Sequence, residues 1–294
     1  MFPAAFDYRR AEDVDDVIAL LHEHGDDAKL IAGGQSLLPL MKFRLAAPDL
    51  LVDIGRVDGL RGVRRQGDHL LIGAATTHQD VLDSAVVREH CGALPAVVRH
   101  VGDPQVRHRG TLGGALAHGD AAGDLPALAV ALEAELVLAS QKRRRRVPAA
   151  GFFDGYLETA LAPDELLLSV RVPVLDDSWS WAYEKFAPVS HAWAVVGVCT
   201  LVRRVGDRIT DVRVGLTNMG DVPLRATHTE AALSGATVSP AAVTAAAGLA
   251  DRDTTPPSDT NADADYRRHL ARVLTARALG RALDLAVPDP DADA

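Results

Sequence analysis

The apolar positions at the start of the chain recur at helical spacing and then give way to short apolar runs. A helical face ends at Gly25, a residue that commonly closes a helix. Residues 29–32 predict a strand, a second helical stretch begins at Ser36, and residues 50–54 predict another strand. We expect residues 1–55 to form a small alpha/beta lobe. The four apolar residues of the first helical face are Val14, Val17, Ile18 and Leu21.

The pattern changes near residue 56, where short apolar strands begin to alternate with helices. We interpret residues 56–175 as a second lobe, followed by a linker over residues 174–180 that contains two consecutive aspartates. The predicted elements are strands at 69–74, 134–139 and 166–172, helices beginning near His78 and Leu94, a helix at 126–132, and a hairpin at 139–147.

Residues 180–287 have a third pattern, in which strands come first and helices follow. The segments 181–186, 194–202 and 212–216 are suited to three antiparallel strands, with Gly206-Asp207 turning between the last two. The remaining predicted helices cover 226–233, 240–249 and a longer stretch from Tyr266 to Ala278. This order predicts a smaller α+β domain, and the acidic residues 288–294 are expected to be a disordered tail.

Composition excludes several classes of function. Of the 294 residues, 48% are hydrophobic, but no run of about 18 apolar residues predicts a membrane span. A net charge of -9 argues against nucleic-acid binding, which depends on clustered basic residues. The basic run 142–146 is interpreted as a solvated hairpin tip, with a docking patch as the alternative. No signal-like N-terminus is visible, so a cytoplasmic location is expected.

The chain has only two cysteines, Cys91 and Cys199, which lie far apart in the sequence. Two thiols cannot supply the roughly four ligands of an iron–sulfur cluster. Neither a disulfide framework, a metal site nor a catalytic set of residues can be singled out.

Two glycine-rich turns carry the clearest chemical signal. Gly33-Gly34 follows a predicted strand and precedes a helix, an arrangement in which bare backbone N–H groups can bind phosphate. Taken alone, an ordinary tight turn is the more common explanation. A second turn, Gly113-Gly114 after Thr111, offers the matching half of a diphosphate clamp. Rossmann and P-loop motifs are both missing from the sequence.

The residues around both turns resemble a known family. Residues 30–44 read LIAGGQSLLPLMKFR and residues 102–126 read GDPQVRHRGTLGGALAHGDAAGDLP. They are similar to the FAD-binding medium subunit of molybdenum hydroxylases, the group that includes carbon monoxide dehydrogenase and xanthine dehydrogenase. The resemblance continues through residues 151–153 and 183–185 to the C-terminal helices.

The resemblance implies a two-lobed PCMH-type FAD-binding domain at 1–175 and a carbon monoxide dehydrogenase flavoprotein-type domain at 180–287. It implies FAD as cofactor, with the first turn and the Ser36 hydroxyl holding the diphosphate from one side and the second turn from the other. Asp124, Leu167 and Lys185 match family contacts of the cofactor. The implied cofactor residues are Leu30, Ile31, Ala32, Gly33, Gly34, Gln35, Ser36, Leu37, Thr111, Leu112, Gly113, Gly114, Ala115, Asp124, Leu167, Lys185 and Trp193.

Several of these residues have ordinary structural alternatives. Asp124 precedes a Leu-Pro pair, so it is also suited to the N-cap of a helix. Lys185 would by default be a surface lysine on a strand, and Trp193 has core packing as its alternative.

The sequence departs from the family pattern at a few positions. His108 stands where relatives usually have Asn, and its default explanation is structural. Gly119 and Ala121 replace a common Ala and a frequent Pro. Gln35 stands where some carbon monoxide enzymes have His, which leaves carbon monoxide open as a substrate.

Three functions are compared on this basis. The first is an electron-transfer subunit that works with a molybdopterin-containing large subunit and a small subunit carrying two-iron two-sulfur clusters, in a dimer of heterotrimers. The electron acceptor of this complex is left open. The second is a stand-alone flavin-dependent oxidase or reductase, and the third is an assembly protein that has lost the cofactor. The intact glycines of both turns argue against the third.

Overall fold

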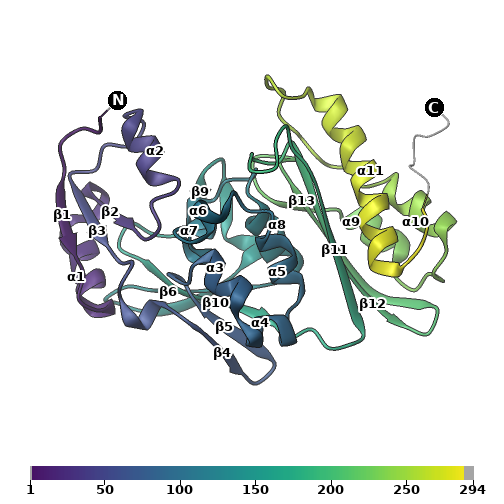
Figure 1. Cartoon of the computed structure of the whole chain (residues 1–294), viewed down its shortest axis with the longest axis horizontal. Helices are drawn as coiled ribbons and strands as arrows, with labels where there is room; N and C mark the ends of the chain where they lie inside the picture. The colour runs from purple at the N-terminus through teal and green to yellow at the C-terminus, as the bar shows by residue number, and fades with distance from the viewer. Residues whose placement is uncertain (1, 288–294) are drawn as a thin grey trace.

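The computed structural model describes residues 2–287 and arranges them in three parts along the long axis of the molecule (Figure 1). The acidic segment 288–294, expected to be disordered, lies outside the described residues. The chain passes from an N-terminal lobe, through a central lobe, to a C-terminal sheet covered by helices (Figure 1).

The N-terminal lobe is a three-stranded parallel sheet with the order β1-β3-β2. Helix α1 ends at Gly25 as predicted, and its apolar face packs on the sheet. Strand β1 was not predicted, because its four residues are all exposed and show no apolar alternation. The elements are β1 (Asp7–Arg10), α1 (Val14–His24), η1 (Gly25–Asp27), β2 (Ala28–Ile31), α2 (Leu37–Lys42), β3 (Leu50–Asp53) and η2 (Asp58–Leu60).

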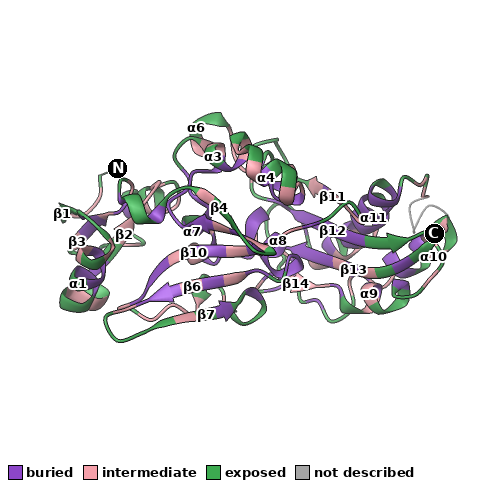
Figure 2. Ribbon diagram, turned by 90° about the horizontal axis from the view of Figure 1, so that it is seen from below, coloured by how far each residue is buried: buried purple, intermediate pink, exposed green. Residues whose placement is uncertain are grey.

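The central lobe is a five-stranded antiparallel sheet with the order β4-β5-β10-β6-β7. On its middle strand Val170 lies opposite both Ile72 and Leu136, and all three are at most 1% exposed. These buried strands run through the centre of the molecule in Figure 2. The strands are β4 (Val63–Gln66), β5 (His69–Gly73), β6 (Glu135–Ala139), β7 (Arg144–Pro148) and β10 (Leu166–Pro173), with a small hairpin of β8 (Phe153–Gly155) and β9 (Glu158–Thr159).

Helices cover one face of this sheet, and the last of them is buried on every side. All eight residues of α8 are buried, because α8 lies between the central core and the C-terminal sheet. This position explains why its sequence, DLPALAVA, has no polar face. The helices are α3 (His78–Asp83), α4 (Ala85–His90), α5 (Ala93–Val98), α6 (Pro104–Arg107), α7 (Leu112–His118) and α8 (Asp124–Ala131), and η3 (Ala149–Gly151) follows β7.

The C-terminal part is an antiparallel sheet with the order β11-β12-β13-β14 and three helices on it. The three predicted strands are present, and β14 adds a two-residue fourth strand. The α+β class and the helix-covered antiparallel sheet are as predicted. The elements are β11 (Trp179–Phe186), β12 (Val196–Val205), β13 (Arg208–Thr217), β14 (Leu224–Arg225), α9 (Thr227–Leu233), α10 (Pro240–Ala247) and α11 (Ala264–Leu283).

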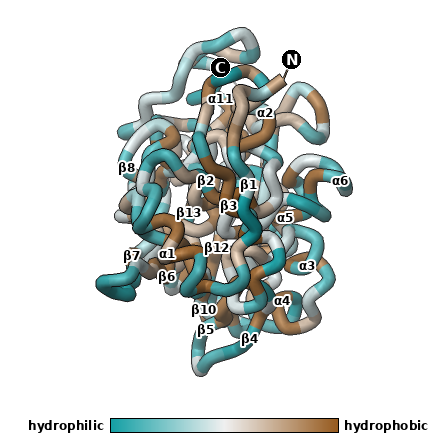
Figure 3. Tube along the Cα trace, turned by 90° about the vertical axis from the view of Figure 1, so that its left-hand side faces the viewer, coloured by the Kyte–Doolittle hydropathy of each residue, from teal (hydrophilic) through white to brown (hydrophobic). Residues whose placement is uncertain are grey.

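The basic run forms part of the predicted hairpin, but most of it is strand. Three consecutive arginines lie on β7, and the hydrophilic turn between β6 and β7 projects from the body of the molecule (Figure 3). Two of the arginines are paired within the chain: Arg145 with Glu165 at 2.6 Å and Arg146 with Glu135 at 3.3 Å. Among the helices of residues 2–287, none has both the length and the apolar character needed to cross a membrane.

Candidate cofactor site

The first glycine turn presses directly against the backbone that leads into the second. A methyl group built on Gly33 would lie 2.0 Å from the carbonyl oxygen of Arg109, so only glycine allows this approach. The next residue, Gly34, has a φ of +72°, which a side chain would strain. The two turns are therefore neighbours in space. At Gly33 the close approach requires glycine, and at Gly34 the positive φ favours it.

The backbone N–H groups of the first turn are unpaired. Within residues 2–287, no acceptor is bonded to the N–H groups of residues 33–37, and the first paired amide is that of Leu38, which bonds Gly34 O at 3.0 Å. Ser36 stands at the N-cap of α2, and its hydroxyl makes no capping bond. Consecutive unpaired amides in a turn form a concave site for an anion. The first turn has the donors that a diphosphate requires.

The second turn is different, because its amides are used within the fold. Leu112 donates to Thr76 O, Gly113 to Ala74 O, and both Gly114 and Ala115 donate to Thr111, at 2.9–3.1 Å. Thr111 thus caps α7, and its hydroxyl accepts from Gly114 while keeping its own O–H free to donate. The two turns therefore differ: the second has the same glycines, but the N–H groups of residues 112–115 are bonded within the fold.

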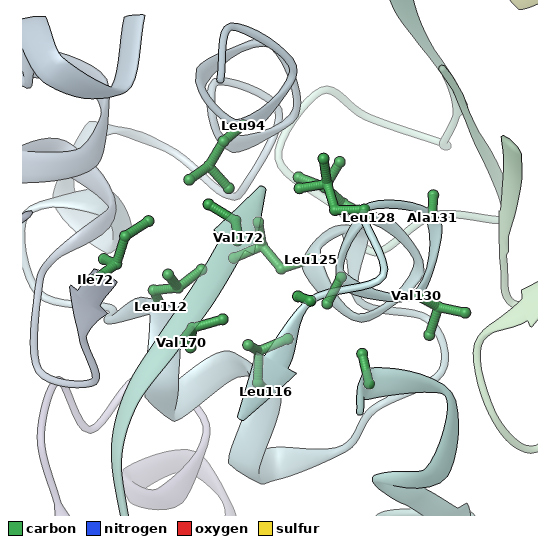
Figure 4. Packing of buried hydrophobic residues seen from close by; sticks show 14 of the residues in the cluster. Ile72, Leu94, Leu112, Leu116, Leu125, Leu128, Val130, Ala131, Val170 and Val172 are labelled. Atoms are coloured by element: carbon green, nitrogen blue, oxygen red, sulfur yellow. The ribbon is translucent and has the colours of Figure 1, made fainter. Parts of the chain in front are cut away.

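Nearly all the residues expected at the cofactor line one cleft of about 890 Å³. The cleft runs from the first turn past the second to Asp124, Lys185 and Trp193, so the structure brings together segments from all three parts of the chain. Leu112 is the exception: its side chain is 3% exposed and points into the central core beside Val170 (Figure 4). The side chain of Leu112, the first residue of α7, therefore belongs to the hydrophobic core.

One end of the cleft contains a buried charged pair. Lys185 Nζ lies 2.9 Å from Asp124 Oδ2, and each side chain is 6% exposed. Lys185 also donates to the carbonyl of His100 at 3.1 Å, while the hydroxyl of Tyr183 donates to the other oxygen, Asp124 Oδ1. Burial raises the pKa of Asp124 above its ordinary value, against the opposing effects of Lys185 and then Tyr183.

The N-cap alternative for Asp124 was wrong. Gly123 is the N-cap of α8, and Asp124 is the first residue of the helix, where a carboxylate is favoured by the helix dipole. Lys185 is likewise no ordinary surface lysine, because its charge is held inside the cleft. Both residues are thus available to a ligand as an ion pair.

The other candidates separate into two groups. Trp193 is 57% exposed on the cleft, so core packing does not explain it, and Leu167 lines the cleft while only 5% exposed. His108 is the C-cap residue of α6, and its Nδ1 lies 2.6 Å from Pro104 O. His108 has a local structural contact and is not among the residues lining the cleft.

Two buried residues next to the cofactor residues escaped the sequence analysis. His78 lines the cleft at 3% exposure, and its Nδ1 has no hydrogen-bond partner within residues 2–287. Burial, with a smaller effect of Arg107, lowers the pKa of His78 to about 4, so the ring is neutral at pH 7. Tyr183 was also missed, although its position two residues before Lys185 on a strand places both on one face.

Comparison with known proteins identifies the family. Residues 4–175 match the family described as FAD binding domain in molybdopterin dehydrogenase, and residues 181–282 match the CO dehydrogenase flavoprotein C-terminal domain. The chain belongs to the FAD-binding medium subunits of the molybdenum hydroxylases. The cofactor of this medium subunit is FAD, and its class of activity is that of the oxidoreductases.

The similarity extends over almost the whole medium subunit. The chain is 40% identical to the carbon monoxide dehydrogenase medium chain of Hydrogenophaga pseudoflava, covering 96% of this chain and 98% of that one. It is 35% identical to the nicotine 6-hydroxylase medium subunit of Paenarthrobacter nicotinovorans, covering 94% and 96%. The solved carbon monoxide dehydrogenase from Hydrogenophaga pseudoflava that lacks the Mo-pyranopterin moiety matches with a TM-score of 0.94 and 42% identity, over 97% of this chain and 99% of that one. Such names imply multi-subunit complexes.

Proposed function

We propose that this chain is the electron-transfer subunit of a molybdenum hydroxylase complex. In this proposal a large subunit carries the molybdopterin cofactor, a small subunit carries two-iron two-sulfur clusters, and this chain passes their electrons to an external acceptor. A dimer of such heterotrimers is the assembly we expect. One observation supports the proposal most directly. A single cleft is lined both by a turn of unpaired backbone amides and by the buried Asp124–Lys185 pair.

In this proposal, different residues of the cleft bind different parts of FAD. The amides of residues 33–37 and the hydroxyls of Ser36 and Thr111 would hold the diphosphate as hydrogen-bond donors. Leu167, Lys185 and Trp193 would contact the flavin. The remaining members of the site are Leu30, Ile31, Ala32, Gly113, Gly114, Ala115 and Asp124, all of which line the cleft. When bound, FAD supplies a redox centre that exchanges electrons singly or in pairs.

The protein contributes a fixed charge at the flavin end. Lys185 is held by Asp124 and by the His100 carbonyl, so its ammonium group cannot swing into solvent without losing both. A cation at such a place favours uptake of negative charge by a neighbouring group. Trp193, which is 57% exposed, lines the same cleft.

The cysteine content supports a partner that carries the clusters. The whole chain has two cysteines, and both are buried and free. Neither can contribute to a cluster ligand set, so in this proposal the electrons arrive from a cluster on another chain. Free thiols also suit a reducing compartment, and we propose the cytoplasm. The substrate is selected on the partner that carries molybdenum, and relatives named for carbon monoxide and for nicotine agree with that division.

Purification of the full chain tests this function. We expect a yellow protein with a flavin absorption spectrum that releases FAD on denaturation, and no turnover of organic substrates by the chain alone. A colourless protein that cannot be reconstituted with FAD would contradict the proposal. Rapid oxidation of a substrate without partners would instead favour the stand-alone oxidase or reductase.

A further inference from the structure

Two side chains of strand β11 (Trp179–Phe186) share the carboxylate of Asp124. The hydroxyl of Tyr183 donates to Oδ1, and Lys185 Nζ donates to Oδ2 at 2.9 Å. The two donors are two residues apart on one strand, so they lie on the same face of the C-terminal sheet. Asp124 begins α8 in the central lobe. The carboxylate is thus oriented from across the boundary between the two parts of the chain.

The fold makes room for the Tyr183 hydroxyl. On the neighbouring strand β12, a methyl group built on Gly197 would lie 2.7 Å from that hydroxyl oxygen. The ring of Tyr183 packs edge-on against His100, with 5.3 Å between ring centroids. The carbonyl of the same His100 accepts from Lys185. The phenol and the ammonium group are therefore both fixed against one backbone segment.

The hydroxyl remains a donor over the whole physiological pH range. Burial, and next the charge of Asp124, raises the pKa of Tyr183 well above its ordinary value. The phenol keeps its proton, and its hydrogen bond favours the ionised form of Asp124. Tyr183 itself is not among the residues lining the cleft, whereas Asp124 and Lys185 are. Any effect of Tyr183 on the cofactor must pass through those two residues.

We propose that Tyr183 is a positioning residue for the flavin end of the cleft, holding Asp124 ionised and in register with Lys185. This proposal rests on the function proposed above. It assigns to the C-terminal sheet a role in adjusting the redox properties of the bound flavin. The effect depends on the hydroxyl group and on the space that Gly197 leaves for it.

The variants Tyr183→Phe and Gly197→Ala test the proposal by different routes. The first removes the hydroxyl and keeps the ring, and the second displaces the hydroxyl while keeping the tyrosine. Tyr156→Phe is the matched control, because Tyr156 is 70% exposed and lies outside the cleft lining. The readouts are the absorption spectrum and midpoint potential of the bound FAD, with the Kd for FAD measured on the apoprotein.

Both variants lose the hydrogen bond in the apoprotein as well as in the complex, so the Kd for FAD is expected to rise by less than about tenfold, the size of one lost hydrogen bond to a charged group. Loss of the hydrogen bond favours protonation of Asp124, and less negative charge favours electron uptake by the flavin. The midpoint potential should therefore become more positive in both variants and stay unchanged in Tyr156→Phe.

Unchanged potentials and spectra in both variants would overturn the proposal, even if their thermal stability fell, and so would a shift to more negative potentials. If one variant does not fold, the other decides by the same criteria. A wild-type chain that binds no FAD overturns this proposal together with the proposed function. A wild-type chain that binds FAD alongside indifferent variants overturns this proposal alone.

Discussion

Lys185 and Asp124 face each other across the boundary between the C-terminal sheet and helix α8, with Nζ 2.9 Å from Oδ2 and both side chains 6% exposed. A buried pair of this kind contributes little net stability, because desolvation of two charges offsets their attraction. Removing one partner is different, since it leaves the other charge buried and unpaired.

Lys185→Met should therefore destabilise the apoprotein by about 3 to 5 kcal/mol. Urea denaturation of the apoprotein measures this effect, and Lys142→Met serves as control because Lys142 is exposed on the β6–β7 turn. The double variant Lys185→Met/Asp124→Asn should recover part of the loss, because the orphaned charge is gone. Additive losses in the double variant would show that the two residues are not coupled.

Gly33→Ala should abolish tight FAD binding while leaving most of the fold intact. The added methyl group would meet the Arg109 carbonyl at 2.0 Å, and the turn must move away from the second turn to relieve the clash. Titration of the apoprotein with FAD should give a Kd at least about tenfold higher. Gly151→Ala is the control, because a methyl group there has no neighbour within 4 Å. Equal affinities of the two variants would argue against a diphosphate at the first turn.

His78 predicts a loss of stability on acidification. Its pKa is about 4 in the folded chain against 6.5 for an exposed imidazole, so between these values the unfolded chain binds more protons. Stability is then complete above pH 6.5 and declines as the pH falls toward 4. The contribution amounts to about 2 kcal/mol between pH 7 and pH 5.

The difference between wild type and His78→Gln isolates that contribution, since the surface carboxylates titrate alike in both. Urea unfolding at pH 7 and pH 5 should give a smaller decline for the variant. Parallel declines in the two proteins would mean that the imidazole is not buried in its neutral form.

Both cysteines should be inert toward thiol reagents in the native state. Burial raises the pKa of Cys91 and of Cys199 to about 12, so neither forms a thiolate near neutral pH. Ellman's reagent should titrate both thiols in urea and neither in buffer. Rapid labelling of the folded chain would show that this region opens readily.

The sequence predicted the regular elements where periodicity and end signals agreed. Helix α1 has an apolar face and a closing Gly25, and both were readable. Strand β1 was not, because its side chains are all exposed and its register with β3 is set by backbone pairing, to which the Tyr8 hydroxyl adds one hydrogen bond to Asp53. Backbone pairing of that kind leaves no mark on side-chain pattern.

The site was predicted unevenly for a related reason. Both turns contain Gly-Gly, yet the amides of one are free and those of the other are bonded to Thr76, Ala74 and Thr111. That difference arises because the residues after β5 lie beside the second turn, a tertiary contact that the local sequence does not show. Asp124 illustrates the same limit, since the local sequence favoured an N-cap and the contact that defines its environment comes from β11.

The composition of the cleft has a consequence for how the chain acquires its cofactor. Its walls come from residues as early as Leu21, from the segment ending at Pro126 and from residues as late as Trp193, so no shorter piece than residues 21–193 contains them all. Contacts between such distant segments form late, because loop closure must come first. FAD would then meet a complete site only after the C-terminal sheet has docked, and cofactor loading would follow chain folding rather than guide it.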